Sequence, residues 1–312
     1  MPHVTFVHGL ANKPPLEKLH QSWLRALQKG GLDLADEGVS STMVYYGDVL
    51  YDQPLEEVEA EESSLERRAE DLDGGGDAEA PLPENTEEAA FLAGFREELT
   101  SLSDGAIESG AADTTPVAAA AATGLERVPL PWFVKKRIMK ALLRDAYLFL
   151  FNKDFSPRAG ASFKVQDVLR QRFLDALAAA PAGEKHVVVS HSMGTMVAYD
   201  CLKRVAGCPK IDGFITMGSP LGVDEVQDCY KPDWSREDGY VADRLGAPWV
   251  NFYDPLDIVC GADPSIANDF RQANVPKIEE FSVINEGAWR HSAVKYLQRR
   301  ELREVLRRLL EL

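Results

Sequence analysis

The sequence has few cysteines and no long uncharged apolar run. Its 312 residues include four cysteines, with no CxxC pair and no histidine at ligand spacing, so we expect free thiols in a reducing compartment and no metal site. No stretch reaches about 18 uncharged apolar residues, and we expect no transmembrane helix. The start, MPHVTFVHGL, enters a strand-like pattern without a basic leader or cleavage site, which predicts a cytoplasmic protein.

Basic residues are also scarce relative to acidic ones. Lys and Arg total 34 against 50 Asp and Glu, a net charge of −16. This shortage of cations argues against a nucleic-acid partner, because neutralising phosphates needs a surplus of Lys and Arg. At 45% hydrophobic and 27% charged residues, the composition is that of a soluble globular protein with a sizeable core.

The negative charge is concentrated in one insert. Between positions 51 and 113, 20 acidic residues stand against three basic ones, a net charge of −17, so the rest of the chain is about neutral. Residues 71–88 combine Gly, Pro and carboxylates and predict a mobile loop. Helical patterns flank it at about 54–71 and 87–101, and the Ala-rich residues 111–124 indicate a linker.

The next segment, residues 131–155, is basic in its first half and apolar in its second. The pattern predicts an amphipathic helix. Two interpretations stay open. The helix can be a lid over the rest of the protein, with its basic face paired to the acidic insert or presented to a membrane or a protein, or it can be ordinary core packing within a cap.

Elsewhere, short apolar runs alternate with helical patterns. The predicted strands are 3–7, 42–46, 186–190, 213–217, 249–253 and 280–284, and the predicted helices are 16–28, 165–179, 194–205 and 292–310. This alternation predicts an α/β fold with a mostly parallel sheet of about six strands flanked by helices. We assign residues 1–50 and 160–312 to this core. Residues 51–159 form an acidic, partly flexible insert and a helical cap, entering between the second and third strands.

The strongest local motif is Ser-His-Ser-Met-Gly at 190–194. It follows an apolar strand and precedes a helix, which predicts a nucleophile elbow with Ser192 at the sharp turn. Gly194 and Ser190 are both small, as the close approach of strand and helix requires. The backbone N–H of Met193 lies at the start of the helix, where negative charge is stabilised.

Three further segments supply the remaining groups of an acyl-transfer site. The first strand ends in His8-Gly9, after which the Leu10 N–H is the predicted second oxyanion donor, with His8 shaping the loop. Asp257 is the preferred acid because it follows the strand 249–253; Asp254 and Asp224 are the alternatives. The predicted base is His291, since no other histidine follows the acid in the chain.

These motifs resemble those of the α/β-hydrolase superfamily, of the lipase or esterase type. The resemblance covers residues 1–50 and 160–312, and the segment Met-Gly-Ser-Pro at 217–220 is a lipase-like detail. It implies that the chain begins at the third strand of the full fold, which leaves a compact six-stranded variant. On this basis a substrate-binding role is predicted for His8, Gly9, His191, Ser219 and Pro220.

The predicted function is hydrolysis of a small-molecule ester or a lipid through Ser192, His291 and Asp257, without a cofactor. The same triad serves thioesterases, amidases and acyltransferases, and these remain alternatives. A further alternative is a non-catalytic, hydrolase-like module that binds a protein through the acidic insert. The oligomeric state is left open.

Overall fold

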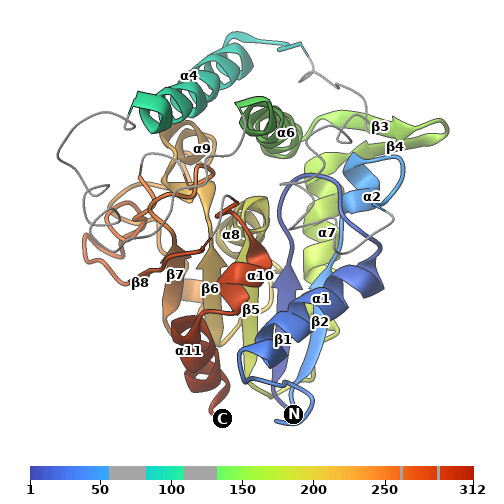
Figure 1. The fold of residues 1–312 in the computed structure, drawn as a ribbon, viewed down its shortest axis with the longest axis vertical. Coiled ribbons are helices and arrows are strands. Elements are labelled where there is room, and N and C mark those ends of the chain that lie inside the picture. The colour runs from blue at the N-terminus through green and yellow to red at the C-terminus, as the bar shows by residue number, and fades with distance from the viewer. Residues whose placement is uncertain (56–81, 109–131, 261–262, 287–288) are drawn as a thin grey trace.

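A parallel sheet runs through the centre of the computed structural model, which describes residues 1–55, 82–108, 132–260, 263–286 and 289–312 (Figure 1). All six strands are parallel, in the order β2, β1, β5, β6, β7, β8. They are β1 (His3–Val7), β2 (Ser40–Val44), β5 (His186–His191), β6 (Gly213–Met217), β7 (Trp249–Tyr253) and β8 (Glu279–Ser282). The predicted α/β class is confirmed.

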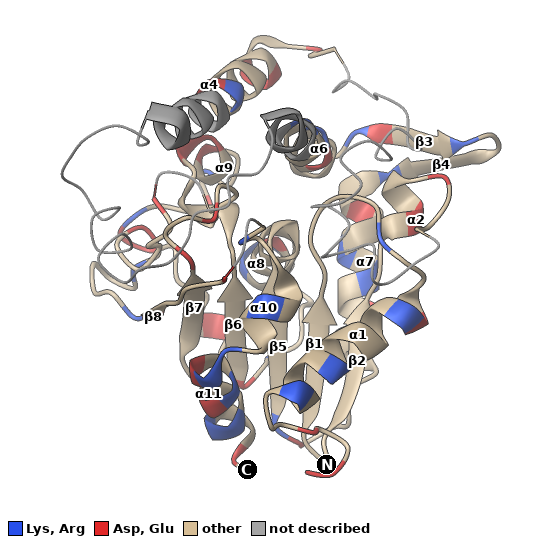
Figure 2. Cartoon of the chain, in the orientation of Figure 1, with Lys and Arg blue, Asp and Glu red and all other residues tan. Residues whose placement is uncertain are grey.

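Helices cover both faces of the sheet. One face packs against α1 (Leu16–Lys29), α10 (Ala293–Leu297) and α11 (Arg300–Leu310), and the other against α7 (Val165–Ala178) and α8 (Met193–Arg204). The central strands β1, β5 and β6 are buried along their whole length, which explains their continuous apolar sequences. Figure 2 shows basic and acidic residues along α11, and the helix buries its apolar residues Leu302, Val305, Leu306, Leu309 and Leu310.

Shorter elements connect this framework. They are α2 (Gly47–Leu50), α9 (Asp224–Asp228), and two 3-10 turns, η2 (Pro220–Gly222) and η3 (Ala242–Arg244). All four cysteines are in the described residues and are free thiols. Among the described helices, not one has the length and apolarity needed to cross a membrane.

Two helices, α4 (Thr86–Glu108) and α6 (Trp132–Leu150), lie in the chain between β2 and β5, and we call them the cap. Figure 1 shows them beyond the carboxyl ends of the strands. Glu88 of α4 accepts hydrogen bonds from the Tyr147 hydroxyl of α6 and from Lys153 Nζ, the latter at 3.2 Å. This buried network connects the two cap helices.

The described cap corrects two predicted boundaries. Helix α4 begins at Thr86, one residue before the predicted 87–101 helix, where the Asn85 side chain caps it by accepting the Glu88 N–H at 2.9 Å, but it continues to Glu108 rather than ending at 101. Helix α6 ends at Leu150 rather than 155. The chain turns at Asn152, which has a φ of 47°, and enters an unpredicted antiparallel hairpin of β3 (Asp154–Arg158) and β4 (Ala161–Lys164).

The predicted 292–310 helix is two helices. Arg299 has an extended backbone, with φ −69° and ψ 135°, and separates α10 from α11. Both helices bury apolar side chains in the same core, so the apolar pattern continues across the break and hides it. The predicted 111–124 linker, residues 71–81 of the predicted loop and most of the predicted 54–71 helix lie outside the described residues.

Candidate active site

The predicted nucleophile lies at the turn between β5 and α8. Ser192 has φ 56° and ψ −131°, a backbone conformation that a non-glycine residue rarely adopts. Two glycines make room for this turn. A Cβ atom at Gly9 would lie 2.6 Å from the Ser192 Cβ, and one at Gly194 would contact the backbone carbonyl oxygens of His8 and Val7. The loop after β1 therefore lies directly against the serine, as the sequence predicts.

His291 and Asp257 form a buried pair. The His291 Nδ1 lies 2.8 Å from the Asp257 Oδ2, and the two residues are only 5% and 3% exposed. Burial alone would raise the pKa of the Asp257 carboxyl. The charge of His291 and the hydrogen bonds from His291, the Val259 N–H and Tyr296 outweigh burial, and the pKa is lowered. An ionised carboxylate only accepts, so the His291 Nδ1 carries a proton, and in the neutral imidazole Nε2 then has the lone pair.

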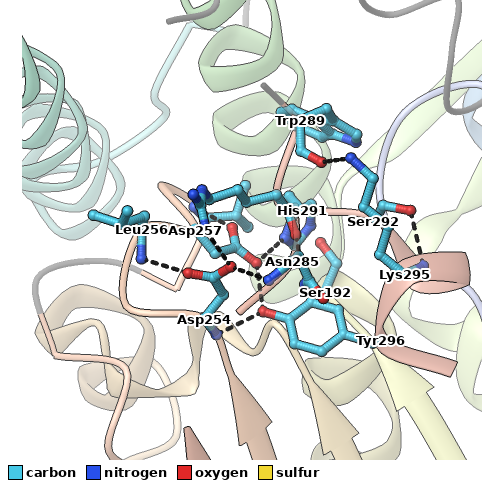
Figure 3. A network of polar contacts seen from close by, with 12 residues as sticks. Ser192, Asp254, Leu256, Asp257, Asn285, Trp289, His291, Ser292, Lys295 and Tyr296 are labelled. Atoms are coloured by element: carbon cyan, nitrogen blue, oxygen red, sulfur yellow. Dashed lines mark hydrogen bonds and ion pairs between the residues drawn. The ribbon is translucent and has the colours of Figure 1, made fainter. Parts of the chain in front are cut away.

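Two polar atoms of this candidate site are buried and unpaired within the part of the chain that the structure describes. Among the described residues, neither the Ser192 Oγ nor the His291 Nε2 has a hydrogen-bond partner. Figure 3 shows the Ser192 side chain beside the His291 ring. Buried hydroxyls and imidazole nitrogens are usually paired, so these two atoms are available to a substrate, to an ordered water or to each other. Hydrogen bonds between catalytic groups are often long before substrate binds.

Aromatic rings hold the plane of His291. The His191 ring lies 4.4 Å away between centroids with an interplanar angle of 33°, and Trp289 meets His291 edge-on at 5.6 Å. Burial, followed by the charge of His291, lowers the pKa of His191 well below its usual value, so this neighbour is neutral. His191, which directly precedes the nucleophile in sequence, thus contacts the predicted base rather than the serine hydroxyl.

His8 fixes the loop that follows β1. The Tyr46 N–H donates to the His8 Nε2 at 3.0 Å, so Nδ1 carries the proton and donates to the Gly9 carbonyl at 2.7 Å. Burial is the main cause that lowers the pKa of His8 to about 3. The N–H and C=O of a trans peptide point in opposite directions. Holding the Gly9 carbonyl therefore also sets the direction of the Leu10 N–H.

The other two carboxylates do not contact His291. Asp254 is buried and accepts from the Leu256 N–H, the Asn285 N–H and the Arg290 guanidinium, at 2.9, 2.6 and 3.0 Å. Asp224 lies on α9 with a 78% exposed side chain and pairs with Arg236. Asp257 is the predicted acid that the fold brings to the predicted base.

Ser219 and Pro220 lie beside the elbow, but their groups have structural partners. The Ser219 hydroxyl accepts the Leu221 N–H at 3.2 Å and bonds with the Thr195 hydroxyl at 2.7 Å. Pro220 is buried at the first position of η2. Their role in binding substrate remains a prediction.

No role was predicted for Tyr296 from the sequence. Its hydroxyl donates to the Asp257 Oδ2 at 2.9 Å and accepts the Asp254 N–H at 2.9 Å (Figure 3). The ion pair of Asp254 with Arg290, the residue that precedes His291 in the chain, was likewise not predicted. A tyrosine on the apolar face of a helix has the same sequence pattern as a core residue, so no sequence signal distinguishes it.

The site therefore forms at the carboxyl ends of β1, β5, β6 and β7. Successive strands are added to one side of β1 up to β2 and to the other side from β5 onward, so the topological switch point lies between β1 and β5. No group of three metal-ligating side chains is found in the described part of the chain. Neither the protein-family models nor the curated proteins include one that matches this sequence. The residues and their geometry are thus the basis for a functional assignment.

Proposed function

We propose that the protein is a serine hydrolase of the α/β-hydrolase type that cleaves carboxylic esters. Ser192 is the nucleophile, His291 the general base and Asp257 the residue that orients the imidazole. One observation carries the proposal: beside the buried His291–Asp257 pair, the His291 Nε2 and the neighbouring Ser192 hydroxyl are both buried without a hydrogen-bond partner among the described residues. Each triad member follows a different strand, in the chain order Ser, Asp, His.

The reaction follows from these positions. The His291 Nε2 takes the proton of the Ser192 hydroxyl as the oxygen attacks the ester carbonyl. The N–H groups of Leu10 and Met193 stabilise the negative oxygen of the tetrahedral intermediate. His291 then protonates the leaving alcohol, and water hydrolyses the acyl-enzyme by the same route. The lowered pKa of Asp257 keeps it ionised, so it stabilises the imidazolium that forms at His291.

A fluorophosphonate probe tests the proposal directly. We expect it to label the wild-type protein and to lose all labelling in Ser192→Ala. Ser190→Ala is the matched control, since Ser190 is also buried in β5 but donates to the Ile215 carbonyl at 3.1 Å. A folded wild-type protein that is neither labelled nor active on p-nitrophenyl butyrate would overturn the proposal and favour a non-catalytic binding module.

The leaving group is tested with substrates that share one acyl chain. Butyryl esters, a butyryl thioester and a butyryl anilide require the same nucleophile and oxyanion donors and differ only in the departing atom. We propose the highest kcat/KM for the ester. Higher kcat/KM for the thioester or the anilide would assign the protein to thioester or amide hydrolysis instead.

The cap belongs to the same proposal as a cover for the site. Ser192 is fully buried and His291 is 5% exposed, so the carboxyl ends of the strands are covered. Figure 1 places α4 and α6 on that side of the sheet. We propose that substrate enters by displacement of this cover. Comparing short and long acyl esters after deletion of the 131–155 segment tests this idea, and an unchanged chain-length preference would contradict it.

A further inference from the structure

The cap helix α6 buries two adjacent charged residues. Arg144 is 7% exposed and Asp145 is fully buried. The Arg144 guanidinium donates to the Asp145 Oδ1 through Nε at 2.9 Å and Nη2 at 2.6 Å, and lies over the Tyr51 ring at 4.6 Å. Removing two charges from water is costly, so such a pair needs further partners to be stable. These further partners bind the other carboxylate oxygen of Asp145, Oδ2.

The Asp145 Oδ2 binds the loop that follows β1. It accepts the Ala11 N–H at 3.1 Å and the Tyr51 hydroxyl at 2.9 Å. Ala11 comes directly after Leu10, the proposed oxyanion donor, and has a φ of 66°. A residue with a Cβ adopts this left-handed conformation at a cost in free energy, so its surroundings must hold it there. Asp145 is the group that holds it.

The peptide that carries the Leu10 N–H is thus held on both sides. On one side, His8 Nδ1 holds the Gly9 carbonyl of that same peptide at 2.7 Å. On the other side, Asp145 holds the N–H of the next peptide. His8 belongs to the sheet framework, whereas Asp145 is carried by the cap. One of the two holding groups therefore depends on the position of α6.

We propose that Asp145 is a positioning residue through which the cap sets the oxyanion hole, an inference that rests on the proposed function. The Leu10 N–H is correctly aimed when α6 is docked, because only then does the Asp145 carboxylate hold the Ala11 N–H. Misplacing an oxyanion donor weakens stabilisation of the transition state without weakening substrate binding equally. The cap thereby switches catalysis as well as covering the serine.

The test compares Asp145→Ala with Tyr147→Phe. Tyr147 lies two residues further along α6, is also buried and binds Glu88 of α4, so its variant weakens the cap without touching the oxyanion loop. We expect Asp145→Ala to lower kcat on p-nitrophenyl butyrate on the order of 10- to 100-fold with KM changed less than about 3-fold. Tyr147→Phe should keep kcat within about 2-fold of wild type, because the loop after β1 keeps both holding groups.

Asp145→Asn keeps the side-chain volume and one amide oxygen that can accept the Ala11 N–H. We expect its kcat to lie between those of wild type and Asp145→Ala, and this variant carries the test if the alanine variant does not fold. Hydrogen exchange gives a readout that is independent of activity. Amides of residues 9–12 should exchange faster in the Asp145 variants than in Tyr147→Phe, while those of β1 stay protected.

The outcomes separate this inference from the proposed function. A wild-type protein without fluorophosphonate labelling or esterase activity would refute the function itself. An active wild type whose Asp145 variants keep wild-type kcat and wild-type exchange at residues 9–12 would overturn the inference alone. Equal losses of kcat in Asp145→Ala and Tyr147→Phe would overturn it as well, because Asp145 would then only anchor the cap.

Discussion

Gly218, directly after β6, lies close to the His291–Asp257 pair. Its φ is 55°, and a Cβ there would lie 2.9 Å from the Asp257 Oδ2 and 3.0 Å from the His291 Nδ1. We predict that Gly218→Ala lowers kcat/KM on the order of 10- to 100-fold, because the added methyl group displaces the imidazole from the serine. The measurement is steady-state kinetics on p-nitrophenyl butyrate together with thermal unfolding.

Gly160 provides the matched control. It has a φ of 78°, but a Cβ there would meet nothing within 4 Å. Gly160→Ala should therefore cost about 1 kcal/mol of stability from backbone strain and leave kcat/KM unchanged. Equal kcat/KM in the two variants would show that the space around Gly218 does not matter for catalysis.

Tyr296 is the second residue at this scale. Its hydroxyl donates to the Asp257 carboxylate, as do the Val259 N–H and the His291 Nδ1, and it also accepts the buried Asp254 N–H. We predict that Tyr296→Phe destabilises the fold by about 1–3 kcal/mol, because a buried donor loses its partner. We also expect kcat to fall roughly 10-fold, since Asp257 is held less firmly.

Urea unfolding and esterase kinetics check both parts of this prediction. Tyr230→Phe is the comparison, because the buried Tyr230 hydroxyl likewise donates one hydrogen bond, to the Met196 carbonyl at 3.1 Å. It should lose stability without losing kcat. A Tyr296→Phe variant with wild-type kcat would show that Tyr296 serves folding only.

At the scale of elements, the sequence predicts the strands well. The strands 3–7, 213–217 and 249–253 have the predicted bounds, since each is a buried apolar run between turn residues. The strand predicted at 42–46 is β2 (Ser40–Val44). Its first two residues, Ser40 and Ser41, pair with His3 and Val4 of β1 but are polar, so a hydrophobicity pattern does not include them. The β3–β4 hairpin was missed because its residues alternate between exposed and half-buried, which gives no apolar face.

The same physical limit applies to the site. Ser192, Asp257 and His291 follow strand ends and could be placed by motif and chain order, as could Gly9 and Gly194. Asp145 and Tyr296 lie inside helical patterns and make their contacts with segments far away in the sequence. Such contacts depend on how elements pack, so only the three-dimensional structure reveals them.

The loop before α10 supplies a prediction at the scale of elements. Asp254, at the end of β7, binds the Asn285 N–H and the Arg290 guanidinium, and the Asn285 side chain donates to the Arg290 carbonyl at 2.8 Å. These contacts fix the residue that precedes His291. Asp254→Asn removes the charge opposite a buried arginine, so we predict a loss of about 3–5 kcal/mol and a clear fall in kcat.

A double-mutant cycle with Arg290→Gln checks the cause. If the ion pair is responsible, the two substitutions together should cost less than the sum of their separate effects. Thermal unfolding and kcat are measured for all four proteins. If the losses of stability in the two single variants add up in the double variant, Asp254 stabilises the fold through its hydrogen bond with the Leu256 N–H rather than through Arg290.

At the scale of the whole molecule, the stability of the fold depends on histidines that stay neutral. His8 and His186 are buried in β1 and β5 or their loops, and burial, as the main cause, lowers the pKa of His8 to about 3 and of His186 to about 4. His186 contacts the Thr5 hydroxyl at 2.8 Å and the His3 ring at 5.2 Å, and Asp212 accepts its backbone N–H. These contacts do not offset the free-energy cost of burying a protonated His186 ring, so the pKa of His186 is lowered.

We therefore predict that the protein loses stability as the pH falls below about 6.5. An unfolded histidine binds a proton near that pH, whereas the folded His186 does so only near 4, so the unfolded state takes up more protons between the two values. Each such histidine contributes a slope of up to about 1.4 kcal/mol per pH unit in this window. Above about pH 6.5, His186 is unprotonated in both the folded and the unfolded protein, so it adds no pH dependence to the free energy of unfolding.

Urea unfolding of wild type and His186→Gln at several pH values isolates this contribution. Asp254 and Asp269, whose pKa values are raised mainly by burial, bind protons in the folded state and act in the opposite direction, but equally in both proteins. The free energy of unfolding of His186→Gln should fall less steeply with acidification, and the two slopes should coincide above pH 7. Parallel curves from pH 7 to 4.5 would mean that His186 takes up its proton in the folded protein as easily as in the unfolded chain.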